Sequence, residues 1–428
     1  MYAKIKMESM TVQHTDETVT LAHQETSPAQ CPVDHSAWSW QKTARDTELV
    51  GTPVERDEAG VWHIRGFEAV RDVLRSANTV QAGFGAEMII RAPQVTNRPI
   101  LYQDGKEHQL QRKQTARFFT PKAVSDNYRD LMEKLSDKLV RRLKRQRQVD
   151  LTQLSLALSV SVAGQVVGLT NSFPGLTQRL EAFFENNQSA LDGRFGKLKR
   201  FLHVRSRILA FFYLDVLPAI RARKRKPQED VVSHLLAKNY SNAEILTECV
   251  TFGAAGMVTT REFISIAALH LLERPELRKR YLEAPEEERQ AILHEILRLE
   301  PVVTRLVRRT TADIEVESNG SRVVIPAGEK IDLHVYNANM DEEVVGELPL
   351  ALCPGRELKG DHIPEMVMSF GDGTHRCPGA YIAIQETDIF LQRLLAIEDL
   401  RIVSKPSMSW DNLTTGYVLR HFNVAVDR

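Results

Sequence analysis

One short loop near the end of the chain carries residue types suited to binding a metal. The stretch FGDGTHRCPG, from Phe370 to Gly379, contains three glycines and one cysteine, Cys377. A cysteine thiolate is a strong ligand for transition metals, and as an axial ligand of haem iron it favours O–O bond cleavage. Gly371 and Gly373 permit positive φ and close backbone approach, which would bring amides to the sulfur and lower its basicity. A glycine-rich turn with an incidental buried cysteine fits these residues equally well.

The position of this cysteine supports a role as a ligand. The residues after the loop, YIAIQETDIFLQRLLA, predict a helix, so Cys377 would lie near a helix N-terminus, where the dipole favours an anion. Cys31, Cys249 and Cys353 form no CxxC pair and no zinc-finger spacing. Four scattered cysteines in a chain of 428 residues are expected to be free thiols.

The loop matches a family pattern. Phe370, Gly371, Gly373, His375, Cys377 and Gly379 reproduce FxxGxxxCxG with histidine two residues before cysteine. This pattern resembles the cysteine loop of the cytochrome P450 superfamily, the haem-thiolate monooxygenases, in its soluble bacterial form. The resemblance implies haem b (iron protoporphyrin IX) as cofactor and Cys377 as its axial iron ligand. It also implies that His375 reaches a haem propionate and that Phe370, Gly371 and Gly379 contact the cofactor.

An ion-pair motif precedes this loop by about eighty residues. Glu295-Ile296-Leu297-Arg298 ends a predicted helix, and charges at positions i and i+3 share a helix face. ExxR alone is common on charged helices, but in this position it resembles the structural ion pair of the P450 family. The resemblance implies Arg356 as the third partner.

A basic motif lies further upstream. The stretch DGKEHQLQRKQTARFFTP is similar to the helix with which the P450 family holds the haem propionates. His108 and Arg112 are four residues apart, so both can face one anionic group. Arg308 matches the family's next propionate-binding arginine, with Arg309 as a near neighbour. A solvated basic face is the alternative.

The helix expected to cross the haem face departs from the family pattern. In the stretch FGAAGMVTTREF, Ala255, Gly256, Thr259 and Thr260 match the pattern, whereas Val258 stands at the position of an acid. The resemblance assigns Thr259 and Thr260 to catalysis, with Thr259 assisting oxygen activation and proton delivery. Thr259 is also expected to bend the helix by bonding to the carbonyl of Ala255.

The valine leaves the source of protons open. Glu262 lies four residues after Val258 and is expected to face an arginine or solvent. A sharper hypothesis makes Glu262 the replacement acid, acting through water, and substrate hydroxyls or ordered water are a third route. The retained Thr259 favours a monooxygenase. The alternatives are a peroxide-driven or oxidative-coupling P450, or a catalytically silent binding protein of the same fold.

Substrate contacts are expected, by the same resemblance, in several separate apolar stretches. The candidates are Ile89, Ile90, Phe252, Met257, Val302, Val303 and Val418. Such a lining predicts a small hydrophobic substrate, although each residue fits plain core as well. Between Arg194 and Lys226, eleven Lys and Arg residues accompany one acid, Asp215. This run indicates a solvated helix face, with a carboxylated or carrier-bound substrate as the alternative.

The elements that must position these residues are mostly helical. Apolar periodicity predicts helices over 127–147, 244–272 and 286–300, and a helix hidden from water in VDLTQLSLALSVSVAGQVVGL. Val54–Ile64 and Arg309–Leu333 are β-rich. The expected fold is mainly α with a small β-rich lobe, a cytochrome P450 fold in a single large domain. We expect that domain over 36–428, after a disordered polar arm over 1–35.

Composition limits the possible partners. The chain is 43% hydrophobic and has 56 basic and 56 acidic residues, so no overall field favours nucleic acid or an anionic membrane. The polar N-terminus predicts neither a secretory signal nor a membrane anchor, hence a cytoplasmic protein. By family resemblance, electrons come from a ferredoxin or flavodoxin with its reductase, which would dock near Arg112 and Lys113.

Overall fold

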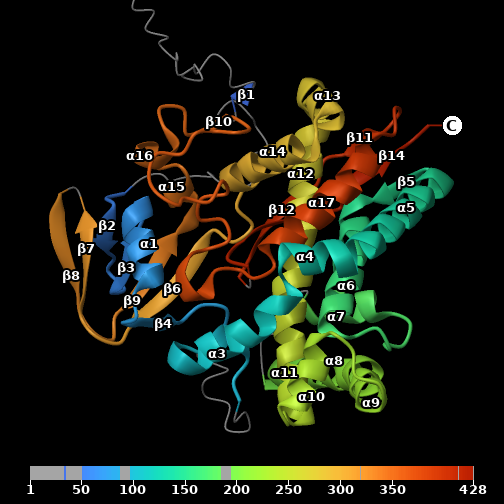
Figure 1. The fold of residues 1–428 in the computed structure, drawn as a ribbon, viewed down its shortest axis with the longest axis horizontal. Coiled ribbons are helices and arrows are strands. Elements are labelled where there is room, and N and C mark those ends of the chain that lie inside the picture. The colour runs from blue at the N-terminus through green and yellow to red at the C-terminus, as the bar shows by residue number, and fades with distance from the viewer. Residues whose placement is uncertain are drawn as a thin grey trace, which may run out of the picture.

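Helices dominate the chain and gather beside a smaller β-rich region (Figure 1). The computed structural model describes residues 33–34, 51–86, 97–184, 194–318, 320–412 and 414–427. This architecture confirms the predicted mainly α fold with a β-rich lobe. Ile89 and Ile90 lie outside the described residues, as does most of the arm predicted over 1–35.

The helices follow the chain in this order. They are α1 (Phe67–Arg75), α3 (Gly105–Thr115), α4 (Pro121–Ala123), α5 (Arg129–Gln146), α6 (Leu151–Val167), α7 (Leu176–Phe184), α8 (Arg194–Phe211), α9 (Leu217–Arg225), α10 (Val231–Ala237), α11 (Asn242–Gly253), α12 (Thr259–Leu272), α13 (Pro275–Glu283), α14 (Glu286–Leu299), α15 (Val335–Asn339), α16 (Glu342–Val345) and α17 (Ala380–Leu395). Short 3₁₀ segments are η2 (Ile100–Tyr102), η3 (Ala116–Phe118) and η7 (Gly373–His375), and π segments are η4 (Val124–Tyr128), η5 (Phe212–Val216) and η6 (Ala254–Val258). The helices predicted over 244–272 and 286–300 are therefore confirmed.

The strands form several small sheets. They are β1 (Val33–Asp34), β2 (Val54–Arg56), β3 (Val61–Ile64), β4 (Thr79–Gln81), β5 (Gln148–Asp150), β6 (Arg305–Thr310), β7 (Ile314–Ser318), β8 (Ser321–Ile325), β9 (Lys330–His334), β10 (Ala351–Leu352), β11 (Arg401–Ser404), β12 (Ser407–Asp411), β13 (Gly416–Arg420) and β14 (Asn423–Ala425). The five-stranded sheet has the order β2-β3-β9-β6-β4, in which β3 and β9 pair in parallel and the other pairs are antiparallel.

The helix predicted to be hidden from water is α6. Most of its residues are buried, and it packs against α12. Asp150 caps its N-terminus by accepting a hydrogen bond from the Thr152 amide at 2.9 Å, and Gly168 ends it at φ 102°. Within the described ranges, no helix has the length and apolar character needed to cross a membrane.

The central helix is a continuous run of α11, η6 and α12. It begins with a capping box, in which Ser241 and Glu244 satisfy each other's backbone amides. The π segment η6 then widens the helix over Ala254–Val258, directly before Thr259. Such π segments are rare and are frequently found at functional sites. The helix therefore changes its geometry where the family pattern predicts a kink.

A buried ion triad holds the end of α14. Arg298 donates to both oxygens of Glu295, at 2.6 and 3.0 Å, and Nε of Arg356 lies 3.4 Å from Oε2 of Glu295. Burial acts to raise the pKa of Glu295, but the charges of Arg298 and Arg356 outweigh it and the pKa is lowered. The amide of Cys353 also donates to Glu295, at 2.8 Å. Cys353 is disulfide-bonded, so the prediction of four free thiols is wrong, although Cys249 and Cys377 are free.

Candidate active site

Backbone hydrogen bonds and two glycines shape the cysteine loop. The amide of Cys377 donates to the carbonyl of Phe370 at 2.9 Å, which closes the loop. Gly371 and Gly373 have φ values of 67° and 66°, which favour glycine. A Cβ on Gly373 would lie 2.2 Å from the carbonyl oxygen of Leu74, so no side chain fits there. The loop is thereby pressed against the C-terminal end of α1.

The expected backbone amides surround the thiol of Cys377. Burial raises its pKa, and the amides of Gly379 and Ala380 and the charges of Arg112 and Arg376 act in the opposite direction. The surrounding protein outweighs them, so the pKa of the Cys377 thiol stays above its ordinary value. A coordinated metal ion supplies the additional positive charge that deprotonates such a thiol.

Cys377 borders two adjoining, largely apolar cavities between the central helix and the cysteine loop, which share Thr259, Thr260 and Cys377 in their walls and are together called the cavity below. Its wall includes Thr251, Phe252, Ala255, Thr259 and Thr260 from the central helix, Val302, Val303 and Leu306 after α14, and Leu101, Phe370 and Ala383 from other segments. Met257 and Val418 are instead buried in the protein interior, at 1% and 4% exposure, and do not border this cavity within the described part of the chain.

Thr259 faces the cavity and makes the expected hydrogen bond to the carbonyl of Ala255. Because this bond uses the hydroxyl proton, the oxygen lone pairs of Thr259 stay available to a donor in the cavity. Val258 is 4% exposed and does not border the cavity as the described residues define it. The missing acid is therefore not replaced on this turn of the helix.

Glu262 faces arginines, as one of the sequence-based interpretations expected. It is fully buried, and its carboxylate accepts hydrogen bonds from Arg261 at 3.0 Å and Arg420 at 2.6 Å. The amide of Leu419 donates to it at 2.8 Å. Glu262 is not among the described residues that border the cavity. Its contacts indicate a structural role in joining α12 to β13.

Glu386 on α17 was missed by sequence reasoning and does border the cavity. Its side chain is 2% exposed, and its Oε1 has no hydrogen-bond partner in the part of the chain that the structure describes. Burial raises the pKa of Glu386 to about 8, although a hydrogen bond from Ser159 acts to lower it. In the sequence, Glu386 is one of several polar residues in a helix, and nothing there indicates that it points inward.

Substituting Glu386 with glutamine tests this burial. The folded-state pKa of about 8 lies above the ordinary value of 4.5, so between these pH values the folded protein binds more protons than the unfolded chain. Wild-type stability is therefore expected to fall as the pH rises through this window. In Glu386→Gln, stability should fall less between these pH values than in the wild type. The measurement is thermal unfolding of the ferric holoprotein as a function of pH. The exposed Glu283→Gln variant should follow the wild type. Identical pH profiles for Glu386→Gln and wild type would contradict the assignment.

Two histidines stack beside the cysteine loop. The rings of His108 and His375 are parallel within 13°, with centroids 4.1 Å apart. His375 donates from Nε2 to Asp104 at 3.0 Å. His108 is 2% exposed, and its Nδ1 has no hydrogen-bond partner within the described ranges. Burial, assisted by the charges of His375 and Arg112, lowers the pKa of His108 to about 4.

Arg308 is held inside the cavity by strand pairing. It lies opposite Gln81 in the register of β6 and β4, and its guanidinium donates to the Gln81 side chain. Arg308 is 4% exposed, and burial lowers its pKa to about 10. Arg309 points elsewhere and donates to the carbonyl of Gly328 at 2.8 Å. Sequence reasoning missed Gln81, because nothing in its own segment indicates which arginine it faces.

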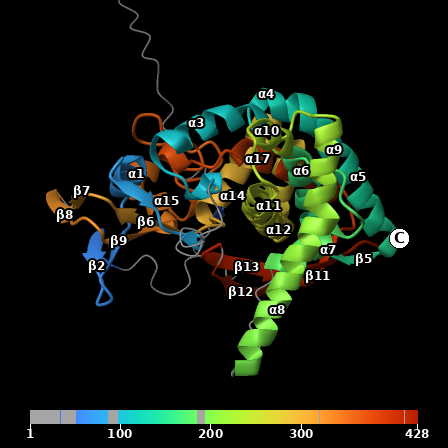
Figure 2. The same ribbon diagram turned by 90° about the horizontal axis from the view of Figure 1, so that it is seen from below.

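The basic run between 194 and 226 lies on α8, η5 and α9, and α8 extends well past its neighbours in Figure 2. Its single acid, Asp215, is fully buried and paired with Arg179 at 2.6 Å. Arg223 is likewise buried and paired with Asp230. Lys224 is exposed, and none of the described side chains of this run borders the cavity. The geometry favours the interpretation as a solvated face.

The residues around the cavity fit a haem. Arg112 and Arg308 both border it and have no carboxylate partner within salt-bridge distance among the described residues. The buried, unpartnered Nδ1 of His108 lies on the same wall. These groups match the two carboxylates of haem, and the thiol of Cys377 matches its iron.

Comparison with known proteins points the same way. A family model described as Cytochrome P450 matches residues 289–408, which include the ion-pair helix and the cysteine loop. Cytochrome P450 130 of Mycobacterium tuberculosis is 26% identical over 379 residues, covering 84% of this chain and 87% of the relative. The steroid C26-monooxygenase of the same organism is 26% identical over 367 residues, covering 83% and 92%.

The solved structure of the cytochrome P450 enzyme CYP109B1 from Bacillus subtilis superposes with a TM-score of 0.70. The match has 23% identity and covers 87% of this chain and 96% of the other. All three comparisons point to the cytochrome P450 superfamily. The chain is accordingly an oxidoreductase, and the cofactor of that superfamily is haem. Compared with the pattern of that superfamily, Val258 stands in place of the usual acid.

Proposed function

We propose that this cytochrome P450 is a haem-thiolate monooxygenase, which inserts one atom of O₂ into a small hydrophobic molecule. The observation that carries the proposal is that Cys377 and the hydroxyl of Thr259 face one apolar cavity. The similarity to the steroid C26-monooxygenase supports the reaction type. The apolar side chains of Phe252, Val302 and Val303 border the same cavity and support a hydrophobic substrate.

The residues that hold the cofactor follow from the cavity wall. Cys377 would ligate the iron, and Arg112, Arg308 and His108 would hold the propionates. His375 orients His108 through the stacked rings and is itself held by Asp104. When bound, haem supplies the iron at which dioxygen is activated.

The side chains of the chain itself handle protons. Thr259 accepts a hydrogen bond from a donor in the cavity, because its own proton is held by Ala255. Glu386 is protonated at neutral pH, because burial raises its pKa to about 8, and it borders the same cavity. The other acid among the described residues of the wall, Asp372, is paired with Arg75 at 2.8 Å. Glu386 is therefore the acid best suited to hold a proton for the reaction in place of Val258.

Electrons reach this site from a separate ferredoxin or flavodoxin and its reductase. Arg112 borders the cavity and donates to the carbonyl of Arg376, so its charge is engaged inside the protein. Lys113 and Arg376 are exposed nearby and can meet an acidic partner. The partner surface is therefore expected to include Lys113 rather than Arg112.

The test is reconstitution with a ferredoxin, its reductase and isotopically labelled O₂. Substrates are first selected from a panel of hydrophobic molecules by their shift of the haem spin state. Labelled oxygen in the product, with O₂ consumption that depends on substrate, is the expected result. Equal product formation with H₂O₂ alone would favour a peroxide-driven enzyme and overturn the proposal. Absence of any oxidised product from a tightly bound ligand would favour a silent binding protein.

Substituting Thr259 with alanine is expected to uncouple the reaction. Without the hydroxyl, proton delivery is no longer directed, so the yield of product per O₂ consumed should fall about tenfold or more. The measurement is product and H₂O₂ formed per O₂. Thr247→Ala is the matched control, because Thr247 makes the same type of bond, to Ala243 at 2.6 Å, on the exposed face of α11. If both variants formed the same amount of product per O₂ consumed, Thr259 would have no role in catalysis.

A further inference from the structure

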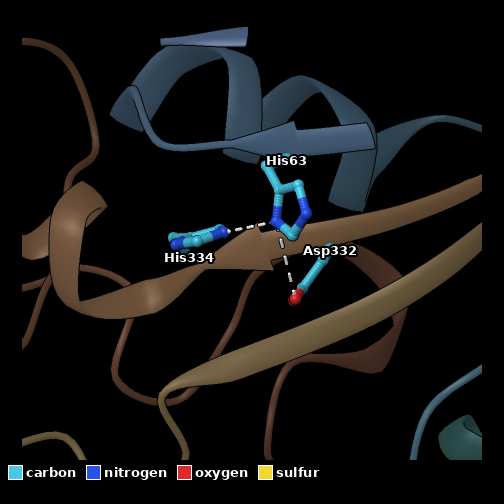
Figure 3. Close-up of side chains that lie close together, drawn as sticks. All are labelled: His63, Asp332 and His334. Carbon is cyan, nitrogen blue, oxygen red and sulfur yellow. Dashed lines mark hydrogen bonds and ion pairs between the residues drawn. The ribbon is translucent and has the colours of Figure 1, made fainter. Parts of the chain in front are cut away.

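A second group of metal-ligand side chains lies in the β-rich lobe. His63 comes from β3, and Asp332 and His334 come from β9 (Figure 3). His63 and Asp332 are partners in the parallel pairing of β3 and β9. Asp332 and His334 are two residues apart, so they share one face of the sheet. None of the three is among the described residues that border the haem cavity.

The distances suit a transition-metal ion. Nδ1 of His63 lies 2.9 Å from Nε2 of His334 and 3.8 Å from Oδ2 of Asp332. One ligand atom from each of the three residues lies within 4.8 Å of the others. Zinc ligands are about 2.0–2.2 Å from the ion, so two of them are roughly 3 to 3.5 Å apart. Small adjustments of these side chains therefore bring all three to one ion.

The hydrogen bonds around the two imidazoles direct lone pairs at each other. Asp57 lies 3.1 Å from Nε2 of His63, and a proton on that nitrogen leaves the lone pair of His63 on Nδ1. Arg305 lies 2.9 Å from Nε2 of His334 and has only N–H groups to offer, so this nitrogen must accept. Two acceptor nitrogens 2.9 Å apart repel unless a cation or an additional proton lies between them.

Asp332 adds an independent observation. Its Oδ1 is shielded from solvent and has no hydrogen-bond partner in the described part of the chain. Its Oδ2 accepts from Arg305 at 3.0 Å. A buried carboxylate oxygen without a donor is costly, and coordination of a metal ion satisfies it. The contact between Asp57 and His63 is also the carboxylate–histidine arrangement that orients metal-binding imidazoles.

We propose that His63, Asp332 and His334 bind a divalent transition-metal ion such as Zn²⁺. Arg305 competes with the ion, because it contacts the same oxygen of Asp332 and the same nitrogen of His334. Its side chain is 23% exposed, so it can turn toward solvent when the metal enters. The ion would tie β3 to β9, strands that are far apart in the sequence.

The test is calorimetric titration of the chelator-treated ferric holoenzyme with Zn²⁺. One ion per chain is the expected stoichiometry, and His63→Ala and His334→Ala should each weaken binding at least about tenfold. Asp57→Asn should weaken it by about 10- to 100-fold, as expected for loss of an orienting carboxylate. His362→Ala, at an exposed histidine, is the matched control and should bind like the wild type. The haem spectrum of each variant reports whether it has folded.

The Arg305→Gln variant is expected to change the affinity for Zn²⁺ in the opposite direction from the histidine variants. Removing the competing cation is expected to tighten Zn²⁺ binding several-fold, which a misfolded variant would not do. Unchanged or weaker binding by Arg305→Gln would overturn the proposal. Binding that survives in His63→Ala or His334→Ala would place the zinc elsewhere and overturn it as well. If neither the wild type nor Arg305→Gln showed saturable binding of Zn²⁺, an additional proton on His63 would lie between the two imidazole nitrogens in place of a metal ion. The proposal would then be wrong.

Discussion

Replacing Cys377 with alanine is expected to abolish the strongly red-shifted Soret band of the reduced, CO-bound protein. In the proposed enzyme the thiolate of Cys377 would donate electron density to the iron, and alanine would remove this donor while leaving the cavity wall otherwise unchanged. The measurement is the CO difference spectrum of haem-loaded protein at equal haem content. The expected effect is complete, because the band depends on the axial sulfur.

Cys249→Ala is the matched control for this experiment. Cys249 is the other free cysteine of the described chain, it is 1% exposed, and burial raises the pKa of its thiol well above the ordinary range. This variant should keep the red-shifted band. A wild-type protein with a normal Soret position, or a Cys377→Ala variant that keeps the shifted band, would show that Cys377 is not the axial ligand.

Replacing Arg298 with alanine is expected to lower the free energy of unfolding by about 3 to 5 kcal/mol. Arg298 is fully buried and donates to Glu295 and to the carbonyls of Asn339 and Ala351. Its removal leaves the buried carboxylate of Glu295 with only the amide of Cys353, at 2.8 Å, and the longer contact to Arg356, at 3.4 Å. The carbonyl of Asn339 also loses this donor. The measurement is urea unfolding at fixed pH and haem content.

Two comparisons sharpen this prediction. Arg298→Lys keeps the charge but loses the planar fork that contacts both oxygens of Glu295, so its effect should be intermediate. Lys134→Ala removes a side chain that is 73% exposed and paired with Asp130, and should cost about 1 kcal/mol or less. If Arg298→Ala were no less stable than Lys134→Ala, the ion triad would not support the fold.

Local spacing was enough to predict the parts of the site that lie within one element. The bond from Thr259 to Ala255 and the pair of Glu295 with Arg298 each join residues three or four apart on one helix. Helix geometry alone brings such residues together, whatever the rest of the fold does. Only part of the surroundings of Glu262 could be predicted locally. Its partner Arg261 is adjacent in sequence, whereas its partner Arg420 is 158 residues away.

The contact of Arg356 with Glu295, 61 residues away, was expected from the family resemblance, and other contacts between distant segments were not predicted. The pairing of Gln81 with Arg308 depends on the register of β4 and β6, and no local sequence pattern predicts that register. In the sequence, Glu386 resembles any other polar residue of a helix. Only the packing of α17 places it at the cavity. Met257 and Val418 were expected at the substrate from the family resemblance and their apolar character, and apolar character is shared by cavity walls and the buried interior.

The cysteine loop, the ion-pair helix and the central helix with valine at position 258 could be recognised in the sequence, because each is encoded within a few consecutive residues. The side chains around the thiol of Cys377 and the position of Glu386 at the cavity depend on how distant segments pack. The meeting of His63 and His334 on one sheet, 271 residues apart, depends on the same packing. Strand register and helix packing are set by burial of apolar surface across the whole domain, and no single segment contains that information.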